Sequence, residues 1–312
     1  MKATKKLIGA LAALVIAIAV ATGSTFAWFT TNQKVTVESL DLQVTSGNDD
    51  LQIALGKPTS ATDWSNLKFG RKILSADVLK DKTISLDALT SADTDHNGVE
   101  LKDKENSAAG EGSYLEFDLS FYSNKGLSVL LGNTAEVAVK DTAVQAHQIF
   151  AWDDSITEAT YGQAVAKGAR IEARAAHASR IAFVTGSGDS ATGKVWAPFE
   201  TTANGGNDTT QAGFYKGNLA AAYYNYSLGV SESIAQTVAK NVILPLTNDS
   251  TYASTSEILI LEKPAAETAS IYYGTVTVKV WLEGTDGDCL NSIFEDKMTV
   301  MLNLTGIMKS GS

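Results

Sequence analysis

The sequence has one cysteine, four prolines and three histidines among 312 residues, and these shortages narrow what the protein can be. A single cysteine forms no intramolecular disulfide, so the fold depends on its own core. Cys289 lies beside carboxylates in GTDGDC, which disfavour the thiolate that a nucleophile needs. The chain contains neither the HExxH pattern of zinc peptidases nor the GxSxG pattern of serine hydrolases. We therefore expect a protein that is not an enzyme.

Positive charge is scarce as well. The chain carries a formal charge of −10, and no cluster of lysine and arginine offsets it. An acidic surface repels the phosphates of nucleic acids and of anionic lipids, so we expect no nucleic-acid partner. Apolar residues make up 44% of the sequence, which is enough to bury a full core.

The first 27 residues predict an export signal. Three lysines precede an uncharged run over residues 7–21, which is shorter than the ~20 residues needed to cross a bilayer. Small side chains precede Trp28, as signal peptidase requires, so we predict a signal peptide helix over 1–27 with cleavage between Ala27 and Trp28. An uncleaved anchor and an earlier cut are the alternatives. Cleavage would take the charge from −10 to −13 and leave no stable membrane span.

Apolar and polar residues alternate over many later segments, as they do in strands with one buried face. The clearest segments are 115–121, 276–282 and 300–304, and further candidates begin at residues 135, 180, 194 and 257. Clusters of glycine, asparagine, aspartate and serine separate them. We predict an all-β fold, an antiparallel β-sandwich or jelly roll. It forms a single domain over 28–312, with short helical or loop insertions near 155–178 and 201–228.

The first strand candidate changes parity within its length. Val35 and Val37 share one parity, whereas Leu40, Leu42 and Val44 share the other. Both groups can lie on one face only if the strand is interrupted. We therefore predict a bulge or bend near residues 38 and 39.

Residues 188–195, GDSATGKV, partly match a phosphate-binding loop. They carry its glycines and its lysine, but Val195 replaces the hydroxyl that binds magnesium. A strand pattern follows where the loop would need a helix. We interpret the stretch as a hairpin loop between two strands.

The stretch DTDHNGVELKDKE begins like a calcium-binding loop. Asp93, Asp95 and Asn97 supply side-chain oxygens at alternating positions, Val99 supplies a main-chain oxygen, and a glycine permits the turn. A lysine replaces the closing glutamate. The stretch is either a weak calcium site or a solvated acidic turn that needs no metal.

Two other sets of residues have an alternative functional interpretation. The carboxylates of EGTDGD at 283–288 resemble an acid/base pair, but a flexible turn lacks the fixed geometry of catalysis, so we expect a solvated turn. The tryptophans form either a sugar-stacking platform or part of the core. They are Trp28, Trp64, Trp152, Trp196 and Trp281.

The N-terminal region carries two short motifs. A G-T-x-A-x-F-like junction is matched by Gly23, Thr25, Ala27 and Phe29. A G/S-x-L-D-L-type strand motif is matched by Ser39, Leu40, Asp41 and Leu42. Together they resemble the N-terminus of the TasA/camelysin group of bacterial biofilm and surface-fibre proteins, in which a dedicated signal peptidase cuts the junction.

The resemblance implies an exported protein of the bacterial surface or extracellular matrix. Members of the group that polymerise do so by donor-strand exchange, in which a freed N-terminal strand completes the sheet of the next subunit. The candidate donor residues are Val35, Val37, Leu40, Leu42 and Val44. The alternative is that this strand belongs to its own domain.

The resemblance thus predicts a fibre subunit whose partners are copies of itself or other matrix proteins, with signal peptidase as a partner during export. The second interpretation is a surface adhesin that binds glycans, with or without calcium.

Overall fold

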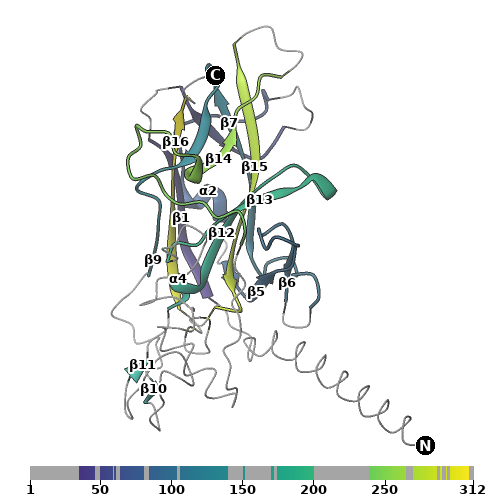
Figure 1. The fold of residues 1–312 in the computed structure, drawn as a ribbon, viewed down its shortest axis with the longest axis vertical. Helices are drawn as coiled ribbons and strands as arrows, with labels where there is room; N and C mark the ends of the chain where they lie inside the picture. Colours follow the sequence, from purple (N-terminus) through teal and green to yellow (C-terminus); the bar gives the residue numbers. More distant parts are fainter. Residues whose placement is uncertain are drawn as a thin grey trace, which may run out of the picture.

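The computed structural model describes residues 35–45, 50–58, 60, 64–80, 84–103, 106–139, 150–151, 170–171, 174–199, 239–264, 270–286, 289, 293 and 296–308. These residues form a β-sandwich built mainly from two seven-stranded sheets, as the alternating patterns predict (Figure 1). The export signal, the insertion near 201–228 and most of the insertion near 155–178 lie outside the described residues.

The first sheet has the strand order β14-β8-β16-β1-β3, with β4 paired to β1 and β9 paired to β16. Its members are β1 (Val35–Val44), β3 (Lys72–Ile73), β4 (Ile84–Leu86), β8 (Ser128–Leu131), β9 (Glu136–Val139), β14 (Glu257–Ile260) and β16 (Lys297–Ile307).

The second sheet has the order β13-β12-β15-β5-β6, with β7 paired to β15 and β2 paired to β7. Its members are β2 (Gln52–Leu55), β5 (Ala88–Ser91), β6 (Leu101–Lys102), β7 (Leu115–Ser123), β12 (Ser179–Thr185), β13 (Thr192–Trp196) and β15 (Tyr272–Glu283). The remaining elements are α2 (Ser75–Leu79), α4 (Ala175–Ala178), η1 (Gly188–Ser190), η2 (Ser254–Ser256) and the pair β10 (Phe150–Ala151) and β11 (Arg170–Ile171).

The main core lies between the two sheets. Each long strand contributes every second residue to it, so that Leu119 and Phe121 of β7 and Val278 of β15 are all buried. On β1, the five apolar residues on either side of the parity change are all buried. The register between β1 and β16 shifts between Val37 and Ser39, which confirms the predicted bulge.

Part of the outer face of the second sheet is buried as well. A second apolar cluster covers that part and contains Leu89, Leu101, Ala182, Val184, Val195 and Trp281. Strand β12 is therefore buried almost throughout, because Ile181 and Phe183 face the main core while Ala182 and Val184 face the second cluster. The alternation expected for a sheet with one solvated face does not hold there.

Most strand pairs are antiparallel, but two are parallel. Strand β1 pairs with β16 in parallel, and β5 pairs with β15 in parallel. A parallel pair cannot be joined by a hairpin. Here almost the whole domain separates β1 from β16. The stretch GDSATGKV does join antiparallel neighbours, β12 and β13, which confirms the hairpin interpretation.

We predict that replacement of a β1 core residue destabilises the monomer. Leu42 is fully buried, so Leu42→Ala should lower the free energy of unfolding by about 2–5 kcal/mol through lost burial and a residual cavity. The neighbouring Gln43→Ala, whose side chain is on the half-exposed face, should change it by less than about 1 kcal/mol. Urea denaturation measures both. Equal effects of the two substitutions would contradict the inward orientation of Leu42.

Candidate functional site

The first candidate site is the slot that β1 occupies in the first sheet. On one side, β1 pairs with β16 from Thr36↔Lys297 to Val44↔Leu304. On the other side it meets only short strands, since β4 pairs with residues 35–37 and β3 with residues 42–43. Strand β1 thus has one long partner and two short ones.

Helix α2 fills the gap between β3 and β4. The main-chain N–H of Leu40 donates to the Ser75 hydroxyl oxygen at 2.9 Å, and the N–H of Ser75 donates to the Asp41 carboxylate at 3.2 Å. A side chain therefore accepts the hydrogen bond of a β1 amide that lies between the two short strands. The Ser39 to Leu42 motif thus lies where α2 contacts β1.

Polar contacts hold Thr45, the first residue after β1, in place. The Thr45 hydroxyl donates to the side-chain oxygen of Asn303 at 2.7 Å and lies 3.3 Å from a carboxylate oxygen of Asp249. The Thr45 main-chain N–H donates to the carbonyl of Leu304 at 3.0 Å. Asn303 is fully buried, and the other carboxylate oxygen of Asp249 accepts the N–H of Asn133 at 2.8 Å. These contacts join β1, β16 and two loops at one end of the slot.

An ion pair lies near the other end of the slot. Lys297 Nζ is 2.8 Å from a carboxylate oxygen of Glu38, and both side chains are partly exposed. Glu38 is the residue skipped in the register at the bulge. The bulge and the ion pair are both specific to one register of β1 against β16.

The candidate donor residues therefore lie in the sheet of their own chain. Their side chains are at most 6% exposed. An exchanged strand from another copy would make the same contacts, so this arrangement suits either of the two interpretations of β1. The cleavage residues Ala27 and Trp28 lie outside the described residues.

The second candidate site is the acidic turn that resembles a calcium loop. One Asp93 carboxylate oxygen accepts the hydroxyl of Ser91 at 2.7 Å and the N–H of Val99 at 3.1 Å. The other accepts the N–H of Asn97 at 2.8 Å. Burial raises the pKa of Asp93, but these hydrogen bonds outweigh it and hold the pKa below its ordinary value. Asp93 thus organises the turn through protein donors.

The other three predicted calcium ligands also have protein partners. Asp95 pairs with the ammonium of Lys240, and the side-chain oxygen of Asn97 accepts the N–H of Asn241 at 2.9 Å. The carbonyl of Val99 accepts the ammonium of Lys279 at 2.7 Å. Calcium binding would require these donors to move away from the ligand oxygens. The described part of the chain contains no group of three or more histidine, cysteine or acidic residues placed to hold a metal.

The acidic turn packs tightly on the outer face of the second sheet. Gly98 has a φ of +77°, and a Cβ atom there would lie 2.5 Å from the Cβ of Ala182 and 3.0 Å from the Trp281 ring. Glycine satisfies both the backbone conformation and the close approach. The turn thus covers part of the second apolar cluster.

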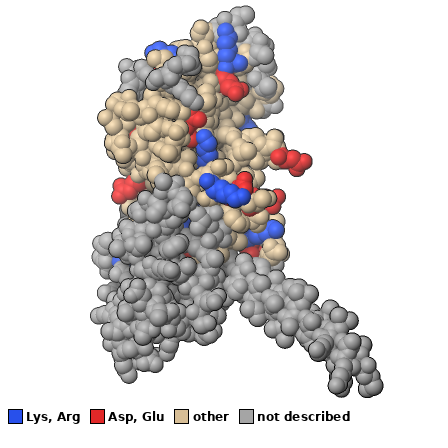
Figure 2. Space-filling view, viewed as in Figure 1, with Lys and Arg blue, Asp and Glu red and all other residues tan. Residues whose placement is uncertain are grey.

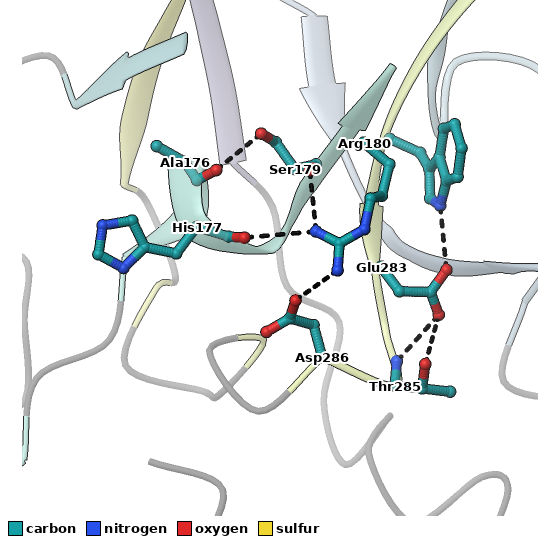
Figure 3. Close-up of polar contacts among 8 residues, drawn as sticks. Ala176, His177, Ser179, Arg180, Glu283, Thr285 and Asp286 are labelled. Carbon is teal, nitrogen blue, oxygen red and sulfur yellow. Dashed lines mark hydrogen bonds and ion pairs between the residues drawn. The ribbon is translucent and has the colours of Figure 1, made fainter. Parts of the chain in front are cut away.

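The third candidate site is a buried charge cluster at the end of β15 (Figure 3). Arg180 donates to a carboxylate oxygen of Asp286 at 2.7 Å and to the carbonyl of Ser179 at 3.0 Å. Arg180 is 4% exposed and Asp286 is fully buried. The prediction of a solvated turn at 283–288 was wrong for its described part, because Arg180 on β12 supplies a cation that the local sequence does not reveal.

Glu283 belongs to the same cluster and is 1% exposed. One carboxylate oxygen accepts the N–H of Thr285 at 3.1 Å and its hydroxyl at 2.7 Å, while the other faces the indole nitrogen of Trp281 at 3.4 Å (Figure 3). Burial raises the pKa of Glu283, although the positive charge of Arg180 and the hydrogen bonds of Thr285 oppose the shift. The buried guanidinium thus pairs directly with Asp286 and acts on Glu283 through its charge.

The structure places the three described tryptophans in three different groups of residues. Trp196 and Trp281 are buried, at 3% and 1% exposure, and belong to the core clusters. Trp64 lies on the surface with other aromatic residues, a grouping that the sequence did not suggest. Trp28 and Trp152 lie outside the described residues.

Comparisons with known proteins assign no family. No protein-family model, curated protein or solved structure matches the chain. In the residues that the structure describes, no helix has the length and apolar character needed to cross a membrane.

We predict that Glu283→Gln changes how stability depends on pH. Because the pKa of Glu283 is raised in the folded protein, folded wild-type protein binds this proton more tightly than the unfolded chain does. Its contribution to stability is therefore present at low pH and is lost as pH rises from the ordinary carboxyl value, 4.5, toward the folded value.

Urea denaturation across pH 4 to 8 measures this effect. Relative to wild type, Glu283→Gln should gain stability with rising pH, by up to about 1.4 kcal/mol per pH unit within the window. Glu111→Gln, at an exposed position, serves as the control and should follow wild type. A constant difference between Glu283→Gln and wild type at every pH would contradict the raised pKa.

We also predict that the two aspartates of the acidic turn differ in importance. Asp93→Asn should lower the free energy of unfolding by about 1–3 kcal/mol without calcium, because it weakens several hydrogen bonds to a charged group. Asp95→Asn removes only an exposed ion pair and should cost less than about 1 kcal/mol.

Calcium is tested on the same two variants. If the turn binds calcium, about 10⁻³ M calcium should raise the melting temperature of wild type and of neither variant, compared with EDTA. A wild-type melting temperature that is the same in calcium and in EDTA would eliminate the calcium site.

Proposed function

We propose that the protein is an exported, non-enzymatic structural component of the bacterial surface or extracellular matrix, whose subunits join by exchange of β1. The observation that carries this proposal is the slot in the first sheet. Strand β1 is the first strand of the described chain and pairs with the last, β16, in an internal position of the sheet.

Removal of β1 would leave an acceptor groove that suits one particular strand. The N–H and C=O groups of β16 would lose their partners, and pockets for five apolar side chains would open in the core. An exposed, apolar sheet edge is a strong template for another strand. The bulge at Glu38 and the Thr45 contacts would then select the correct register.

Exchange between identical chains replaces contacts within a chain by the same contacts between chains. Its cost is therefore small, and domain-swapped assemblies form in this way. The residues before β1 carry the export pattern, so cleavage at the predicted junction would place β1 close to a new N-terminus. Cleavage would free that end of the strand.

The known contacts of the polar residues also support a structural role. Asp93, Glu283 and Asp286 each bond to protein groups that hold a turn or a strand end in place. These contacts account for the three acidic residues without a catalytic role. Export without disulfides requires a large self-sufficient core, which the sandwich provides.

A cross-linking experiment tests strand exchange. The mature protein, residues 28–312, receives Glu38→Cys and Lys297→Cys, whose native side chains form an ion pair across the slot at 2.8 Å. The native Cys289 is fully buried and should not react. After incubation at high concentration and treatment with a short bismaleimide, exchange should give a ladder of covalent oligomers in a denaturing gel.

Two controls define the outcome. A mixture of the two single-cysteine variants should give covalent dimers but no longer ladder, because each chain then carries one reactive end. Wild type should give neither covalent dimers nor a ladder. If the double variant yields only internally linked monomer at every concentration and pH where the protein is folded, the exchange proposal is wrong.

A further inference from the structure

Three reactive side chains lie together at the point where β1 ends. Thr45 supplies a hydroxyl, Asn303 on β16 supplies a carboxamide, and Asp249 supplies a carboxylate. On the face of the molecule shown in Figure 2, by contrast, acidic and basic side chains of the described residues lie interspersed among other residues. We call Thr45, Asp249 and Asn303 the Thr45 triad.

The functional groups of the Thr45 triad contact one another. The Thr45 hydroxyl oxygen lies 2.7 Å from the amide oxygen of Asn303 and 3.3 Å from a carboxylate oxygen of Asp249. The same carboxylate oxygen lies 3.5 Å from the amide nitrogen of Asn303. One oxygen of Asp249 is thus within reach of both the hydroxyl and the amide nitrogen.

Main-chain groups hold two members of the triad in position. The N–H of Gly132 donates to the main-chain carbonyl of Asn303 at 2.7 Å. The second carboxylate oxygen of Asp249 accepts the N–H of Asn133 at 2.8 Å. A nucleophile beside a base, with a further group that orients the base, is the general arrangement of nucleophilic catalysis.

The triad occupies a space that Gly132 leaves open. A Cβ atom at Gly132 would lie 2.6 Å from the amide nitrogen of Asn303 and 3.1 Å from a carboxylate oxygen of Asp249. Asn303 is fully buried, so water has little access to its amide carbon. The amide therefore faces a hydroxyl and a carboxylate in a site that excludes most water.

We propose that Thr45 and Asn303 form an ester bond between their side chains, which joins the end of β1 covalently to β16. The hydroxyl oxygen of Thr45 bonds to the amide carbon of Asn303, and the bond between that carbon and the amide nitrogen breaks. Asp249 accepts the hydroxyl proton and passes it to the departing nitrogen, which leaves as ammonia. No oxidant, reductant or further reactant takes part.

The folded chain favours this reaction in two ways. A hydroxyl and an amide react slowly in solution, but contact within a folded chain raises the rate by a large factor. The amide carbon of Asn303 is bonded to the oxygen that the hydroxyl contacts, so rotation of the amide plane exposes the carbon to attack. The released ammonia becomes ammonium at neutral pH and is diluted into the solvent, while burial of Asn303 protects the ester from hydrolysis.

The ester has the role that a disulfide has in many exported domains. Thr45 and Asn303 are 258 positions apart in the sequence, so the bond closes a loop that contains most of the domain. A cross-link of this kind restricts the unfolded chain and stabilises the fold. The bond does not depend on strand exchange, because within a monomer it joins two parts of one chain and after exchange it joins two chains.

Mass spectrometry tests the bond. After incubation at neutral pH, the mature wild-type protein should be lighter than its sequence by the mass of one ammonia molecule. Thr45 and Asn303 fall in different tryptic peptides, because lysines such as Lys297 separate them, and these two peptides should be found linked. Treatment with hydroxylamine, which cleaves esters, should separate them.

Variants identify the role of each group. Thr45→Val removes the hydroxyl and should abolish both the loss of mass and the linked peptides, whereas Thr45→Ser keeps a hydroxyl and should retain them. Asp249→Asn should slow the reaction by about tenfold or more, because it removes the base. A melting curve confirms that each variant is folded.

The proposal is overturned if wild type keeps the full mass of its sequence. It is also overturned if folded Thr45→Val loses ammonia as wild type does, since an asparagine that cyclises on its own main chain gives the same loss of mass. Asp249→Asn that reacts as fast as wild type would exclude the carboxylate as the base.

The location of the bond separates this proposal from strand exchange. Linked peptides in monomers alone support the ester and argue against exchange, whereas linked peptides in covalent oligomers support both. Filaments with exchanged strands but without linked peptides would overturn the ester and leave exchange intact.

Discussion

The parallel pairing of the first and last strands is the constraint on which the rest of the structure depends. Strand β16 has β8 and β9 on one side and β1 on the other, so β1 continues the first sheet across the sandwich. The buried residues of β1 contribute to the same core as those of the second sheet. Helix α2, the short strands β3 and β4, and the contacts of Thr45 are all arranged around β1. Without this strand the main core would be open along one edge.

Hydrogen bonds hold the start of β16 in place. The carbonyl of Asp296 accepts the N–H of Thr36 at 3.0 Å, and a carboxylate oxygen accepts the N–H of Ala175 at 3.0 Å. A short distance earlier in the chain, Arg180 holds Asp286. A buried ion pair adds little net stability because desolvation offsets its attraction, but it defines one arrangement of the chain. Strand β16 is thus held at its start, whereas β1 beside it is bordered on its other side by short elements.

The sequence predicts the longer strands because each has a face directed into a core, but it does not indicate β2, β3, β4, β5, β6 and β8. It also predicts the bulge, since Val37 and Leu40 could not otherwise share a face, and the hairpin at GDSATGKV, since its flanking residues alternate. It does not predict that β1 pairs with β16 in parallel. Alternation specifies which face of a strand is buried, but it does not specify which strand is its neighbour.

The candidate sites were harder to predict for the same reason. The turn at 283–286 is buried through Arg180, which lies 106 residues before Asp286. Trp64 and Phe69 on one loop meet Tyr122 and Tyr273, which lie on two strands that are far apart in the sequence. The oxygens of the acidic turn match a calcium loop in their spacing, yet the partners of Asp95 and Val99 come from distant segments. Local patterns identify reactive residue types, and tertiary contacts decide what those residues do.

The central claim is that β1 completes the sheet of a neighbouring copy. Electron cryomicroscopy of the mature protein, concentrated until it assembles, tests this most directly. The account predicts filaments in which the density of Val35–Val44 lies beside β16 of one subunit and continues into the body of the next. Filaments in which that density returns to its own subunit, or a protein that stays monomeric under all conditions in which it is folded, would contradict it.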